Sequence, residues 1–264
     1  MNAARKYWAI FQTTLVNSLA YPGELLGRSL MILPFMWIFY QLWNVTFAAS
    51  GSDTINGLTL HDTMWYLMMA ETIELGRPRV ARTIAENVKD GSIAYLLNKP
   101  YDFMFYQFSY SMGETVFRSL MTAIFGGAMV WWLAGPPPEL INWPLALIAV
   151  IGAWILNFLV NGMIGLAAFV SEEVAPYEWI YQKFAFIFGG LLIPLDFYPG
   201  WLQKIAFALP FPAILYGPAR LFVSPDTRLF ANILWQQALW ILVLGVLLVV
   251  AYRRGLARLT VNGG

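Results

Sequence analysis

Three long apolar runs without a charged residue constrain this chain more than any other feature. They cover residues 29–49, 145–170 and 233–252. A helix needs about 20 mostly apolar residues to cross the roughly 30 Å hydrocarbon core of a bilayer. Only 12% of the residues are charged, whereas soluble domains carry roughly 25%. The runs therefore predict an all-α integral membrane protein, with residues 1–264 forming a single transmembrane domain.

Three further runs are apolar but carry charge. Phe103–Ala134 is long enough to cross, whereas 61–76 and 177–195 are marginal. Cytoplasmic loops collect Lys and Arg. Basic residues gather before the run at 29–49, between the runs at 61–76 and 103–134, and after the run at 233–252. An even number of crossings must separate these regions, so both marginal runs must cross. We predict six transmembrane helices with both termini cytoplasmic. This topology places 12 of the 16 basic residues inside, namely Arg5, Lys6, Arg28, Arg77, Arg79, Arg82, Lys89, Lys99, Lys183, Arg253, Arg254 and Arg258.

Residues 1–23 precede the first span and are too polar to cross. Their apolar positions recur on one helical face, at Trp8, Phe11, Leu15 and Leu19. This pattern predicts an amphipathic helix that lies on the cytoplasmic surface of the membrane. Residues 21–23, Tyr-Pro-Gly, would then turn the chain toward the membrane. Such a helix could serve as a simple anchor or could bind a partner.

Residues 189–212 stay apolar but contain too many Gly and Pro residues for one helix. Broken helices occur at membrane depth only where protein or water satisfies the freed backbone groups. We predict two short re-entrant helices that dip in from the outside and return near 201–209. Asp196 could lie at an exit gate, but a helix cap is the favoured role. The candidate gate residues are Gly189, Gly190, Pro194, Asp196 and Pro199.

A polar island at residues 81–100 separates the second and third predicted spans. A charged helix comes first, with an apolar face formed by Ala81, Ile84 and Val88. Asp90-Gly91 ends it, because Gly accepts the left-handed conformation at a helix terminus. Ser92 can then cap a second short helix, Ile93–Leu97. The island either packs on its own helix ends or docks a cytoplasmic partner.

Four ionisable residues lie within predicted spans, where charges are costly and are functional candidates. Glu71 and Glu74 are three residues apart in the second span. Glu114 and Arg118, four apart in the third, have the spacing of an intrahelical ion pair. The favoured interpretation is a self-neutralising network in which Arg118 pairs with Glu114 or with a carboxylate of the second span. Alternatively, some of these residues face a transport pathway, where excess carboxylate would favour cationic amphiphiles.

Several classes of chemistry are missing from the sequence. The chain has no cysteine, and its single histidine, His61, has no metal-ligand spacing, so we predict no metal site and no cofactor bound by this chain. A net charge of +1 without a basic face argues against nucleic-acid binding. No G-x-x-x-x-G-K-[ST] motif occurs, so the chain cannot bind ATP through a P-loop. If it pumps, another subunit must supply the energy.

Three segments together resemble a known family. The stretch "DGSIAYLLNKPYD" is similar to the cytoplasmic G-x-[ILF]-x-x-x-L-x-[KR]-P loop of type-2 ABC exporter permeases. The stretch "GLLIPLDFYPGWLQKIAFALPF", followed by "LYGPARLF", resembles their fifth-span signature, with Tyr198 in place of Phe. The terminal "RRGLARLTVNGG" looks like the basic V-x-G-G tail of the daunorubicin-type subgroup.

The resemblance implies a half-transporter of the bacterial cytoplasmic (inner) membrane. A second permease, commonly a related non-identical subunit and otherwise a second copy, would pack beside this one. Two ABC ATPase subunits, which bind ATP and Mg, would dock below. Residues 78–102 would form the coupling loop that contacts the ATPase, with the candidate coupling residues Ile84, Glu86, Val88, Gly91, Ile93, Tyr95, Leu96, Leu97 and Pro100.

The leading functional prediction is export of a hydrophobic or amphipathic compound, either drug-like or a lipid, by alternating access. A lipid-modifying membrane enzyme is the main rival, but such enzymes need converging catalytic side chains, and the carboxylates here are scattered. A non-energised channel or carrier is a second rival. The organised cytoplasmic island argues against it.

Overall fold

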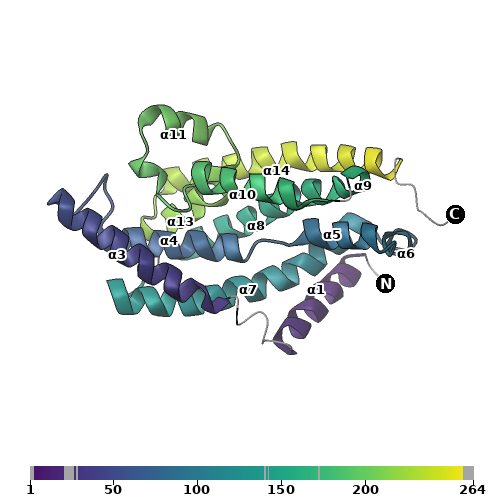
Figure 1. Cartoon of the computed structure of the whole chain (residues 1–264), viewed down its shortest axis with the longest axis horizontal. Coiled ribbons are helices and arrows are strands. Elements are labelled where there is room, and N and C mark those ends of the chain that lie inside the picture. The colour runs from purple at the N-terminus through teal and green to yellow at the C-terminus, as the bar shows by residue number, and fades with distance from the viewer. Residues whose placement is uncertain are drawn as a thin grey trace.

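The computed structural model describes residues 3–20, 27, 29–139, 141, 143–171 and 173–257. Within these ranges the regular structure is helical, apart from one isolated bridge between Ile55 and Leu58. The predicted turn at 21–23, the basic residue Arg28 and the tail from residue 258 onward lie outside the described residues. The long helices run side by side, and the short ones gather at the two ends of the bundle (Figure 1).

In chain order the helices are α1 (Ala3–Ala20), α3 (Ile32–Ser50), α4 (Leu60–Leu75), α5 (Val80–Lys89), α6 (Ile93–Leu97), α7 (Phe103–Ala134), α8 (Trp143–Leu166), α9 (Ala168–Ser171), α10 (Ala175–Phe188), the 3-10 turn η2 (Leu195–Phe197), α11 (Gly200–Phe207), α12 (Phe211–Ile214), α13 (Tyr216–Val223) and α14 (Thr227–Leu256).

Four of the described helical segments are long and apolar enough to cross a membrane, namely α3, α7, α8 with α9, and α14. The two marginal runs are also helical, as α4 and α10. These helices have only 16 and 14 residues, however. The all-helical membrane fold is therefore confirmed, whereas the count of six crossings stays a prediction.

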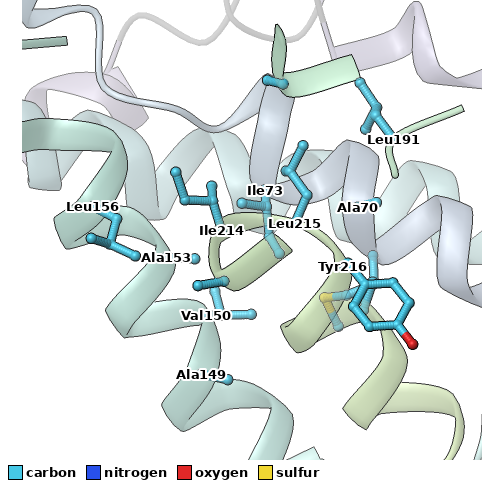
Figure 2. Packing of buried hydrophobic residues seen from close by; sticks show 14 of the residues in the cluster. Ala70, Ile73, Ala149, Val150, Ala153, Leu156, Leu191, Ile214, Leu215 and Tyr216 are labelled. Carbon is cyan, nitrogen blue, oxygen red and sulfur yellow. The ribbon is translucent and has the colours of Figure 1, made fainter. Parts of the chain in front are cut away.

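Helix α4 forms the centre of the bundle. Twelve of its 16 residues are buried, and these include the carboxylates Glu71 and Glu74 as well as apolar side chains. Figure 2 shows Ile73 of α4 beside Leu215, the residue that joins α12 to α13, with Val150 and Ala153 of α8 nearby. The alanines of α8 add little side-chain volume, so that α12 and α13 can pack closely on this helix.

The outer helices turn apolar side chains away from the protein. Trp37 and Val45 of α3 are exposed, as are Trp235, Leu242 and Val246 of α14. Contiguous apolar surface of this kind on a long helix is typical of contact with lipid. These helices therefore form the perimeter around α4.

Helix α1 packs along α7 through a small and polar face. Thr14 and Ser18 are buried against the bundle, whereas Trp8 and Leu19 of the predicted apolar face are more than half exposed. A Cβ added to Gly113 of α7 would lie 2.8 Å from the carbonyl oxygen of Phe11, so the two helices touch backbone to backbone. The predicted apolar face is therefore divided, because Phe11 packs against the core and only Trp8 and Leu19 are exposed. The position of α1 at the membrane surface stays a prediction.

The segment after α10 is broken into short pieces, and its re-entry into the membrane stays a prediction. Helix α11, which covers most of the expected return at 201–209, lies at the end of the bundle far from α5 and α6, with Trp201 exposed (Figure 1). The returning part is α12 with α13, and seven of the eight residues of α13 are buried. The reason is compositional, because α13 offers small and apolar residues to α4 and α8 (Figure 1).

Candidate functional site

The polar island folds into the predicted pair of short helices, α5 and α6. Gly91 has φ +76°, the left-handed conformation that the Asp-Gly step predicted. Ser92 does not cap α6, contrary to the prediction. It takes an αR backbone conformation, and its hydroxyl donates to Asn87 Oδ1 at 3.1 Å instead. The Ser92 side chain and then its backbone N–H, which donates to Asp90 Oδ1 at 2.8 Å, lower the pKa of the Asp90 carboxyl.

The structure divides the candidate coupling residues into two groups. Ile84 and Ile93 are buried, at 0% and 3% exposure, so they pack within the permease itself. Tyr95 is 64% exposed. The remaining candidates that reach the surface fully or in part are Glu86, Val88, Gly91, Leu96, Leu97 and Pro100. Packing within the permease therefore holds for Ile84 and Ile93, and docking stays a prediction for the second group, which any partner must contact.

Helix α5 is tied to the bundle at an apolar contact and at two ion pairs. A Cβ on Gly165 of α8 would lie 3.0 Å from the Cδ1 atom of Ile84. Arg82 Nε donates to Glu178 Oε2 of α10 at 2.7 Å. Lys89 Nζ donates to Glu173 Oε2 at 3.1 Å, which lowers the pKa of the Glu173 carboxyl. A displacement of α5 must therefore also act on α8 and α10.

The ionisable residues of the second and third predicted spans are arranged in pairs, with one exception. Arg118 Nη2 lies 3.5 Å from Glu114 Oε2, as the spacing of four residues predicted. Glu74 Oε1 accepts a hydrogen bond at 2.8 Å from Nη1 of Arg77, just after the end of α4. Glu71 is also buried, but it has no ion-pair partner among the described residues.

A cavity of about 300 Å³ brings these groups together. Helices α4, α7 and α10, the start of α5 and the residues around the start of α3 contribute to its wall. The charged lining residues are Glu71, Glu74, Arg77, Arg79, Arg82, Arg118 and Glu178. Apolar side chains, including Met31, Phe35, Phe186 and Leu192, complete the wall. The cavity therefore combines a charged interior with an apolar rim.

Sequence reasoning did not place Arg77, Arg82 and Glu178 in this site. Arg77 and Arg82 were used only to decide which loops are cytoplasmic, and Glu178 counted only as a charge within the marginal run at 177–195. The available sequence signal was a carboxylate, Glu178, at the start of an apolar helix. In the structure its side chain is 7% exposed, and a carboxylate as buried as this needs a cation. The partner is 96 residues away in sequence, so spacing could not reveal it.

The candidate gate residues lie at the opposite end of the bundle. Gly190 has φ +72° and its carbonyl accepts a hydrogen bond from the Tyr66 hydroxyl at 2.7 Å. Asp196 does not cap a helix, contrary to the favoured role. Its Oδ1 atom lies 3.2 Å from the Tyr216 hydroxyl and 3.4 Å from Arg220 Nε. These contacts join the η2 turn to α13.

A comparison of the sequence with known protein families gives one match. The family described as ABC-2 family transporter protein matches residues 31–263. The chain belongs to this family. It is therefore the multi-pass membrane permease of an ABC transporter, and permeases of this family work with ABC ATPase subunits. Neither the curated proteins nor the solved structures contain a match.

Proposed function

We propose that this ABC-2 permease exports a hydrophobic or amphipathic compound, driven by a separate ATPase. The observation that carries the proposal is the ion pair between Arg82 of α5 and Glu178 of α10. It joins the exposed α5–α6 hairpin to a helix that lines the charged cavity. Force applied at the hairpin would therefore reach the wall of the cavity directly.

The mechanism that follows is alternating access. Closure of two ATPase subunits around ATP and Mg would push on Tyr95 and the neighbouring exposed residues. Helix α5 would carry this movement to α8 through Ile84 and to α10 through Arg82. The cavity would then change its exposure from the cytoplasmic side or inner leaflet to the outside. A second permease, related or identical, would form the other half of the pathway.

The proposed topology has six crossings, in the bacterial inner membrane, with both termini cytoplasmic. The start of α1, the α5–α6 hairpin and the end of α14 lie at one end of the bundle (Figure 1), and each carries basic residues, as cytoplasmic segments do. Helix α4 has 16 residues and would span only about 24 Å at 1.5 Å per residue. Its Thr59 cap at one end and Arg77 at the other supply polar ends to a short crossing.

Purification from the native membrane tests the proposal. We expect an ABC ATPase to co-purify with the wild-type permease and to hydrolyse ATP in the complex. Gly91→Pro should abolish this association, because proline cannot adopt a φ of +76°. Leu96→Asp should weaken it as well. Purification without any nucleotide-binding subunit, or a complex that transports no amphipathic dye in proteoliposomes with ATP, would refute the proposal.

A further inference from the structure

Glu71 is the one carboxylate of the cavity that lacks a cation among the described residues. Glu74 pairs with Arg77 and Glu178 pairs with Arg82. Two other arginines of the wall, Arg118 and Arg79, are also engaged. Glu71 is 5% exposed and receives no hydrogen bond from the described part of the chain.

A buried carboxylate without a partner is costly, because it has lost water and gained no compensating charge. Within a membrane protein such a residue usually belongs to a ligand or ion pathway. Glu71 also meets a geometric requirement for this role, because it lines a cavity rather than the packed core of α4. A ligand in that cavity could reach it.

The rest of the wall indicates the kind of ligand. Phe35 supplies an aromatic ring, and Met31, Phe186 and Leu192 supply apolar surface. An aromatic ring such as that of Phe35 attracts cations and also buries apolar groups, whereas the ring of Phe186 already has Lys183 Nζ over it at 5.3 Å. An anion would have to displace an existing contact to gain an arginine, and a neutral compound would leave Glu71 without a cation. A lipophilic cation satisfies the carboxylate and the apolar wall together.

We propose that Glu71 is the charge-recognition residue of the cavity and that the cavity binds lipophilic organic cations. This inference rests on the proposed export function, because it assigns a substrate class to the same cavity. Ion pairs engage Glu74 and Glu178, the other two carboxylates of the wall, so that Glu71 is the carboxylate left for a ligand.

Two probes of equal shape and opposite charge test the inference. Binding of tetraphenylphosphonium and tetraphenylborate would be measured by equilibrium dialysis on the purified permease in nanodiscs, with empty nanodiscs subtracted. We expect the wild type to bind the phosphonium at least tenfold more tightly than the borate. Glu71→Gln should lose about tenfold in phosphonium affinity, which is the loss of one ion pair of roughly 1.4 kcal/mol.

Glu139→Gln is the matched control, because it removes a carboxylate at an exposed position outside the cavity. It should bind phosphonium as the wild type does. If Glu71→Gln fails to fold, Glu71→Asp keeps the charge and should retain the preference for the cation. Equal phosphonium binding by the wild type and Glu71→Gln, or no preference of the wild type for the cation, would overturn the inference.

The assay also separates this inference from the proposed function. Binding to nanodiscs requires neither ATP nor an ATPase, so a failure of ATP-driven export would leave the charge preference unaffected. Conversely, ATP-driven transport that ignores the charge of the probe would support export and refute the role of Glu71.

Discussion

Arg82 and Glu178 form a 2.7 Å ion pair between α5 and α10. The carboxylate is 7% exposed and the guanidinium 61% exposed, so the pair lies at the boundary between the bundle and the α5–α6 hairpin. Gln182 and Phe186, one and two turns further along α10, line the cavity. The pair therefore connects the predicted ATPase-docking element with the proposed substrate site.

Removing the cation of this pair should uncouple transport from ATP hydrolysis. Arg82→Gln leaves Glu178 buried without a partner, at a cost of about 1–2 kcal/mol once the exposure of Arg82 is taken into account. We expect ATP hydrolysis to continue while transport per ATP falls several-fold. The measurement is the ratio of dye transport to phosphate release in proteoliposomes.

Lys89→Gln is the control, because the Lys89–Glu173 pair joins the same helix at an exposed site, with side chains 49% and 59% exposed. Exposed ion pairs contribute little, because water and salt screen them, so coupling should stay close to the wild-type value. The double variant Arg82→Glu with Glu178→Arg should recover part of the coupling. A transport ratio in Arg82→Gln equal to that of Lys89→Gln would contradict the role of the pair.

Substitutions at Tyr95 and Ile93 should have different effects, the first on ATPase binding and the second on the stability of the fold. Tyr95 is 64% exposed and Ile93 is 3% exposed. Tyr95→Ser should weaken binding of the ATPase without lowering Tm. Ile93→Ala should lower the free energy of unfolding by about 2–4 kcal/mol, because it leaves a cavity in a packed region. Pull-down and thermal unfolding of both variants check this, and a normal complex with Tyr95→Ser would argue against docking at α6.

Gly113 should be essential for the contact between α1 and α7. Gly113→Ala places a methyl group within 3 Å of backbone and side-chain atoms of α1, so α1 must shift, and we expect a loss of about 1–3 kcal/mol. Gly245→Ala in α14 is the matched control, because nothing lies within 4 Å of its added Cβ. Thermal unfolding in nanodiscs should show a lower Tm for the first variant alone. Equal Tm values for the two variants would show that α1 can shift away from α7 without loss of stability, and would contradict the prediction.

Gly190 should tolerate no side chain. Its φ of +72° disfavours L-residues, and an added Cβ would lie 2.8 Å from the Tyr66 hydroxyl. Gly190→Ala should therefore destabilise the protein by about 1–3 kcal/mol. Gly200→Ala, where the Cβ meets nothing within 4 Å, should be close to neutral. Chemical unfolding measures both, and similar curves would indicate that the segment after α10 repacks without cost.

Local patterns predicted most of the secondary structure. The hairpin of α5 and α6 followed from the Asp90-Gly91 step, and the Glu114–Arg118 pair from its spacing of four residues, because both depend on neighbours within one turn. The predicted caps by Ser92 and Asp196 were wrong for the opposite reason. Each side chain found a better partner, Asn87 or Arg220 with Tyr216, that local spacing does not specify.

The sequence by itself determined the all-helical membrane fold, because uncharged apolar runs of this length are stable in lipid only as helices. It also determined where the α5–α6 hairpin begins and ends. Only the tertiary structure decided which charges are neutralised, because the partners of Glu178 and Asp196 come from distant helices. Tertiary packing also decided that α13 inserts beside α4. Among the described residues that packing leaves Glu71 without an ion-pair partner, and this result could not be derived from spacing along a single helix.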